Sequence, residues 1–73
     1  METQKLVINN LSNQEDALKV ENILRDVWGI RKVNVDVDKQ EAVFSYDEKA
    51  ASYIDFQQAV VDAGYRVEGD EGS

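Results

Sequence analysis

Three neighbouring residues carry the side-chain oxygens that are best placed for chemistry: Asn13, Glu15 and Asp16. Carboxylate and amide oxygens bind hard cations such as Ca²⁺ and Mg²⁺, whereas Cu(I) prefers thiolates. Because Ca²⁺ takes about six to eight oxygens, these side chains alone would make a weak, largely hydrated site. A structural role needs no metal, since acidic residues in a first helical turn are stabilised by the helix macrodipole. The sequence favours the structural role and keeps a weak hard-metal site as the alternative.

The chain of 73 residues contains no cysteine and no histidine. This composition excludes disulfides, thiolate nucleophiles, imidazole acid–base catalysis and metal sites built from thiolates or imidazoles. Ser12 has no basic partner that the sequence suggests, and no two carboxylates can be assigned to one cleft. A domain of this size buries only roughly 60% of its unfolded surface, which leaves little room for a deep catalytic cleft. We therefore expect no enzyme activity, no catalytic residue and no cofactor.

Fifteen acidic residues against eight basic ones give a formal net charge of −7 at pH 7. A nucleic-acid-binding domain needs a basic face. The densest basic group here is Arg25, Arg31 and Lys32, which is typical of a solvated face. No stretch approaches the ~20 apolar residues of a membrane-spanning helix. We therefore predict a cytoplasmic protein that neither binds nucleic acid nor inserts into a membrane, and its oligomeric state is open.

The elements that position these residues follow from hydrophobic periodicity. Residues 5–10 alternate as a strand with Leu6 and Ile8 on one face. Ser12 and Glu15 fit a capping box that begins a helix. That helix runs to about Val27 and its apolar residues recur at helical spacing, namely Val20, Ile23, Leu24 and Val27. Gly29 follows the helix, where a left-handed residue is often needed.

The second half of the chain predicts a hairpin, a helix and a short strand. Residues 30–37 and 42–46 alternate apolar and polar side chains around a polar turn, which favours an antiparallel hairpin. Ser52 and Asp55 form a second capping signal before an apolar stripe of Phe56, Ala59, Val60 and Ala63. Residues 65–67 then form the last strand.

The resulting β-α-β-β-α-β order predicts an α+β fold of the ferredoxin-like class, with two helices on one face of a four-stranded antiparallel sheet. The predicted domain covers residues 1–67, and residues 68–73 form a disordered acidic tail.

Several fragments of the chain resemble the heavy-metal-associated domain family, which includes copper chaperones and metal-binding domains of copper-transporting P-type ATPases. The resemblance runs from about Leu6 to Val67. It rests on Gly29-Ile30 after the first helix, on the valine-rich hairpin ending in Tyr46-Asp47, and on Asp62-Ala-Gly-Tyr65. The family's Gly-Met-x-Cys-x-x-Cys loop corresponds to Asn10-Leu11-Ser12-Asn13-Gln14-Glu15-Asp16, and the interval from Asp16 to Gly29 matches the family's spacing.

The resemblance implies a binding domain whose two thiolate ligands are replaced by Asn13 and Asp16. It implies docking of another ferredoxin-like domain, such as a metal-transporting ATPase domain, beside the old metal loop. The candidate contact residues there are Leu11, Leu18 and Tyr65, and Trp28 is a fourth candidate because exposed tryptophans anchor interfaces. We keep two alternatives, namely a weak hard-metal carrier through Asn13, Glu15 and Asp16, and an ACT-like small-ligand regulatory domain.

Overall fold

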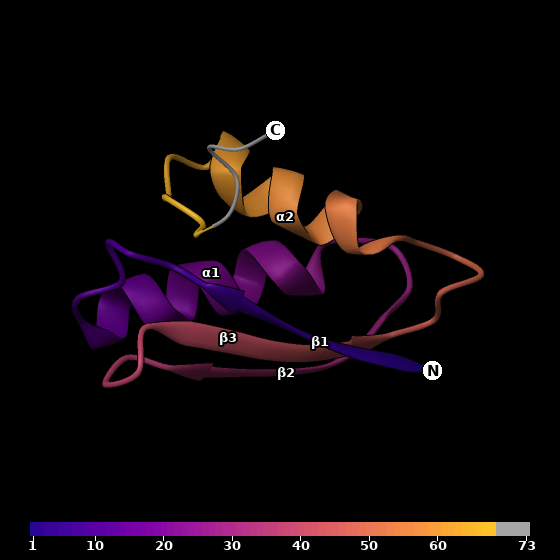
Figure 1. The fold of residues 1–73 in the computed structure, drawn as a ribbon, viewed down its shortest axis with the longest axis horizontal. Helices are drawn as coiled ribbons and strands as arrows, with labels where there is room; N and C mark the ends of the chain where they lie inside the picture. Colours follow the sequence, from indigo (N-terminus) through magenta and orange to yellow (C-terminus); the bar gives the residue numbers. More distant parts are fainter. Residues whose placement is uncertain (69–73) are drawn as a thin grey trace.

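The computed structural model describes residues 1–68 and places two helices on one face of an antiparallel sheet (Figure 1). The elements in chain order are β1 (Glu2–Val7), α1 (Gln14–Arg25), β2 (Ile30–Asp36), β3 (Glu41–Tyr46) and α2 (Tyr53–Asp62). The predicted order of the first five elements, the hairpin and the two-layer architecture are confirmed. No helix within residues 1–68 has the length and apolar character needed to cross a membrane.

The sheet has the order β1-β3-β2, with both neighbouring pairs antiparallel. The predicted fourth strand is present in the described chain only as a single antiparallel bridge between Ile8 and Val67. Two backbone hydrogen bonds flank this bridge, from Asn9 N to Arg66 O at 2.8 Å and from Glu68 N to Val7 O at 2.8 Å. The segment after α2 therefore lies beside the end of β1. Of the predicted acidic tail, residues 69–73 lie outside the described residues.

Three predicted boundaries move by two residues or more, and one of them is the end of β1, which lies at Val7 and not at residue 10. The first strand begins at Glu2 and not at residue 5, because the polar residues Glu2 to Gln4 pair with β3 although they lack an apolar alternation. Helix α1 ends at Arg25 with Asp26 as its C-cap, two residues earlier than expected. The chain then reverses at Gly29, whose φ of +95° is a conformation that favours glycine.

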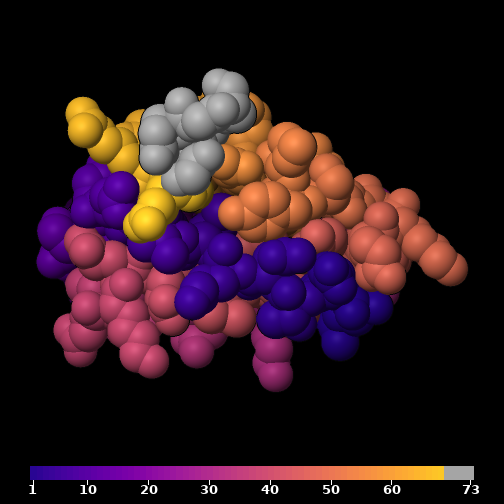
Figure 2. Space-filling model, viewed as in Figure 1, coloured from indigo at the N-terminus to yellow at the C-terminus, as the bar shows by residue number. Residues whose placement is uncertain are grey.

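The core lies between the helices and the sheet. Phe56 of α2 packs against Phe44 and Tyr46 of β3, with ring centroids 4.8 Å apart in both pairs. The predicted core residues Leu6, Ile8, Phe44 and Tyr46 are buried, whereas Val33 and Val35 of the edge strand β2 are only half-buried. In the space-filling view the atoms of β1 cover the face below those of α2 (Figure 2).

The strand β2 contains an irregularity that the alternation of valines does not reveal. Ile30 pairs with Tyr46 and Lys32 pairs with Ser45, so Arg31 is an extra residue between them. Such a bulge locally disrupts the ladder and re-aims side chains. Side chains on a regular strand alternate between its two faces, so Ile30 and Val33, three residues apart, would lie on opposite faces. With the extra residue between them, Ile30 pairs with the core residue Tyr46 and Val33 pairs with the core residue Phe44.

Candidate functional site

The loop between β1 and α1 is held by side chains from distant parts of the chain. Gln40, in the turn between β2 and β3, donates from Nε2 to the carbonyl oxygens of Asn9 at 2.9 Å and Leu11 at 3.0 Å. The Oδ1 of Asn10 accepts a hydrogen bond from the backbone N–H of Arg66 at 2.9 Å. The loop is therefore held by contacts that use the carbonyl oxygens of Asn9 and Leu11.

Asn13 is the N-cap of α1. Its Oδ1 accepts a hydrogen bond from the backbone N–H of Asp16 at 2.8 Å, which satisfies one of the free donors of the first turn. The predicted capping box of Ser12 and Glu15 is therefore wrong by one residue. Asparagine and serine are equally good N-caps. Ser12 is followed three positions later by Glu15, and Asn13 by Asp16, so the local sequence is compatible with a helix that begins at either residue.

The carboxylate of Asp16 is engaged on both oxygens. Ser12 donates from Oγ to Oδ2 at 3.2 Å, and Tyr65 donates from its hydroxyl to Oδ1 at 3.2 Å. The bond from Tyr65 joins the segment after α2 to the first turn of α1. Glu15, the third oxygen donor that the sequence singled out, is exposed at the surface.

The pKa of Tyr65 is raised above its ordinary value. The first cause is burial, which disfavours the charged phenolate, and the second is the negative charge of Asp16, followed by its hydrogen bond with Asp16 and the charge of Glu15. Each of these effects favours the neutral hydroxyl, which is the form that donates to Asp16. The raised pKa therefore favours the form of Tyr65 that makes this hydrogen bond.

This donor set does not fit a soft metal. Cu(I) and similar ions select thiolates and thioethers, and the loop offers an amide and carboxylates. The oxygens of Asn13 and Asp16 already accept hydrogen bonds from the protein. Within residues 1–68 there is no group of three or more His, Cys, Asp or Glu side chains that could hold a metal ion. The geometry is that of a hydrogen-bonded helix start.

The three residues expected to form one exposed patch at this end do not do so. Leu11 has no exposed surface and belongs to the core, so its predicted partial exposure is wrong. Leu18 is 54% exposed, but it lies two residues after Asp16, which is about 200° around the helix axis. Tyr65 is half-buried beside Asp16. Leu11 is buried because the loop folds back through its N–H bond to the Ile8 carbonyl, at 3.2 Å.

Trp28, the fourth candidate, lies at the other end of α1 and is 82% exposed. Trp28 therefore does not pack over the end of the core.

Asn10 and Gln40 are the site residues that sequence reasoning missed. Gln40 adopts a left-handed φ of +54°, and the only local signal for this is its place in a polar turn.

Comparison with known proteins places these features in a family. The heavy-metal-associated domain family matches residues 2–66. The chain is 33% identical over 64 residues to the "Mercuric transport protein periplasmic component" of Shigella flexneri, covering 88% of this chain and 70% of that protein. It is 26% identical over 65 residues to "Copper chaperone CopZ" of Enterococcus hirae, covering 89% of this chain and 94% of that protein.

Solved structures show the same architecture. A copper-binding domain from HMA7, a P-type ATPase, superposes with a TM-score of 0.89 at 22% identity, and the match covers 93% of this chain and 92% of that domain. This likeness supports the ferredoxin-like fold, in which residues 65–67 take the place of the fourth strand. It also shows that the fold is kept although the chain has no cysteine.

Proposed function

Because this chain belongs to the heavy-metal-associated domain family, we propose that it is a cytoplasmic protein-binding domain that has given up soft-metal coordination. It recognises another ferredoxin-like domain in or beside a metal-transport system, such as the metal-binding domain of a P-type ATPase. It carries no copper or mercury itself and catalyses no reaction.

One observation supports this function above all others. The two positions that correspond to the family's cysteines are occupied by Asn13 and Asp16, and both have structural roles. Asn13 caps α1, and Asp16 receives the Tyr65 hydroxyl. Because the side-chain oxygens of both residues accept hydrogen bonds within the domain, the proposed function depends on the surface of the folded domain and not on a bound metal.

The docking surface in this proposal is the end of the fold where α1 begins, formed by residues 10–18 and 64–65. Leu18 supplies exposed apolar area, and Glu15 adds an exposed carboxylate. A partner with basic side chains around an apolar contact complements this surface. Binding is weak, because so few residues cover less than the ~1,200 Å² of stable interfaces.

The test is amide chemical-shift mapping of the labelled protein with a copper-transporting ATPase domain, in the presence and absence of Cu(I). We expect shifts confined to residues 10–18 and 64–65, equal with and without the metal, and weakened by Leu18→Ser. Shifts that require Cu(I), or transfer of Cu(I) to this protein from a competing chelator, would contradict the proposal. So would an absence of shifts at all partner concentrations.

A further inference from the structure

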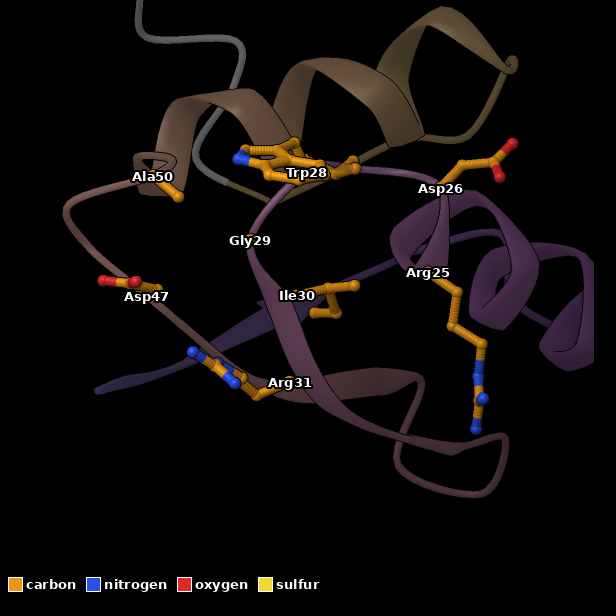
Figure 3. A pocket seen from close by; sticks show the side chains of 9 residues that line it. Arg25, Asp26, Trp28, Gly29, Ile30, Arg31, Asp47 and Ala50 are labelled. Carbon is orange, nitrogen blue, oxygen red and sulfur yellow. The ribbon is translucent and has the colours of Figure 1, made fainter.

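A second surface lies at the opposite end of α1, about 18 Å from the old metal loop for a helix of 12 residues. It is a hollow of about 450 Å³ beneath Trp28 (Figure 3). Ile30 lies between Trp28 and the side chains of Arg25 and Arg31. Trp28 leaves 82% of its surface in water although tryptophan has one of the largest apolar surfaces of any side chain. An aromatic ring beside a hollow is typical of an interface.

Two charged residues beside the hollow have no partner in the described chain. Asp26 is the C-cap of α1, where a negative charge opposes the helix macrodipole. Arg31 is the extra residue of the bulge in β2. Neither side chain makes a hydrogen bond or an ion pair among the described residues, and Figure 3 shows them on opposite sides of Ile30. The position of Asp26 at the C-terminus of α1 is explained if a basic side chain of another molecule pairs with its carboxylate.

The residues that line the hollow include two basic and two acidic side chains, whereas acidic residues predominate in the chain as a whole. Arg25 is paired with Glu21 at 2.8 Å, and the remaining charged residues that line the hollow are Asp26, Arg31 and Asp47. The chain as a whole carries −7. Most of its surface therefore repels a second copy, whereas this patch presents both signs of charge next to exposed apolar area.

We propose that the patch around Trp28 binds a second copy of the same chain in a two-fold symmetric dimer. In such a dimer the same patch meets itself, so a residue on one side of the axis faces its counterpart across it. Asp26 of each copy faces Arg31 of the other, and each indole covers the hollow of its neighbour. An acidic peptide or an anionic membrane would instead meet Asp26, Asp47 and the net negative charge of the chain.

The dimer is weak, because the patch is small compared with the ~1,600 Å² of a standard interface. Sedimentation equilibrium over a range of protein concentrations measures its dissociation constant. Trp28 is the only tryptophan, so its fluorescence reports this surface alone. We expect its emission to shift to shorter wavelength over the concentration range in which the dimer forms.

Exposed-residue variants separate this proposal from the proposed function. Trp28→Ser should raise the dissociation constant of the dimer at least tenfold, and the fold should be unaffected because the side chain is exposed. Leu18→Ser removes an exposed apolar side chain from the other end of α1 and should leave the dimer unchanged. A dimer that is weakened equally by both variants, or by neither, would overturn the proposal.

A charge swap tests the pairing itself. Asp26→Arg and Arg31→Glu should each weaken the homodimer about tenfold, because each places like charges opposite each other. An equimolar mixture of the two variants should regain the wild-type dissociation constant, since the mixed dimer then has one wild-type pair and one pair of reversed sign. Lys39→Glu, in the turn between β2 and β3, makes the same change of net charge as Arg31→Glu and should have no effect. A mixture that stays monomeric would rule out this pairing.

Other occupants give different results. A protein that remains monomeric at every concentration overturns the dimer. A blue shift of Trp28 on phosphatidylglycerol vesicles, in a protein that stays monomeric without them, would assign the patch to a membrane surface and would also overturn it.

Discussion

The hydroxyl of Tyr65 donates a 3.2 Å hydrogen bond to Oδ1 of Asp16, although the two residues are 49 positions apart in the chain. The bond connects the segment after α2 with the first turn of α1, and Ser12 donates to the other carboxylate oxygen. By the resemblance of the loop sequence to the family motif, Asp16 is expected at the position of the second cysteine. In this chain the Asp16 carboxylate helps to fix the start of α1.

Tyr65→Phe removes this bond and keeps the ring. The variant should lose about 1 kcal/mol of stability, since hydrogen bonds to charged acceptors are stronger than average but this one is partly exposed to water. Urea denaturation at neutral pH measures the loss. Asp16→Asn keeps one acceptor oxygen but removes the second acceptor and the negative charge in the first helical turn, so it should lose at least as much stability as Tyr65→Phe. A Tyr65→Phe variant as stable as the parent would show that the bond does not hold the helix start.

Alkaline pH should destabilise the fold. The pKa values of Tyr46, Tyr53 and Tyr65 are all raised above the ordinary value of 10.0, with burial as the first cause in each case. When the folded pKa is above the unfolded pKa, the contribution to stability is complete below pH 10 and is lost as the pH rises through the folded values. Denaturation midpoints measured from pH 8 upward should therefore fall beyond pH ~10, and Tyr65→Phe should reduce the slope. A flat profile would contradict the burial of these hydroxyls.

The two candidate helix caps can be separated by mutation. Asn13→Ala removes the acceptor for the Asp16 N–H and should cost about 1 kcal/mol, the usual effect of losing an N-cap. Ser12→Ala removes only an exposed hydroxyl that donates to Asp16 and should cost a few tenths of that. Thermal denaturation of both variants provides the comparison. A larger loss for Ser12→Ala would restore the capping frame that the sequence first suggested.

The helices and strands with a strong hydrophobic periodicity could be predicted from the sequence. The features that could not be predicted depend on contacts between residues that are far apart in the chain. The Ser52–Asp55 capping box is confirmed, with Ser52 N donating to Asp55 Oδ2 at 3.0 Å, because no competing frame lies beside it. At the first helix either Ser12 or Asn13 could be the N-cap, and the observed cap is Asn13, with the distant Tyr65 bound to Asp16 in the first turn. Leu11 is surrounded in sequence by polar residues, so no local pattern shows that it reaches the core.

Two glycines with left-handed φ angles provide a matched pair for substitution. Gly29 has φ of +95° and Gly64 has φ of +101°, so alanine is strained at both. At Gly64 an added Cβ meets no atom within 4 Å, whereas at Gly29 it lies 3.0 Å from the Cβ of Ala50. Gly64→Ala should cost roughly 1–2 kcal/mol from backbone strain alone, and Gly29→Ala should cost more.

The additional loss of stability in Gly29→Ala should come from a steric contact with Ala50, so a second substitution that removes this contact should restore the stability. Adding Ala50→Gly removes the contact atom and should return the double variant to about the cost of Gly64→Ala, as measured by urea denaturation. If Ala50→Gly gives no recovery, the difference between the two glycines lies in the backbone and not in the contact.

Restoring the two thiolates tests whether only the ligands were lost. Asn13→Cys with Asp16→Cys places two soft donors at the start of α1, the chemistry that Cu(I) selects. We expect the reduced double variant to take Cu(I) from a competing chelator, which the parent protein and the matched Asn13→Ser, Asp16→Ser variant should not do. The metal-free double variant should also be less stable than the parent, because the cap on α1 and the bond from Tyr65 are both removed. Cu(I) should return that stability by binding the folded state. A reduced double variant that binds no Cu(I) would mean that the contacts of Asn10 and Gln40 hold the loop in a shape that excludes the metal, so the change extends beyond the two ligand positions.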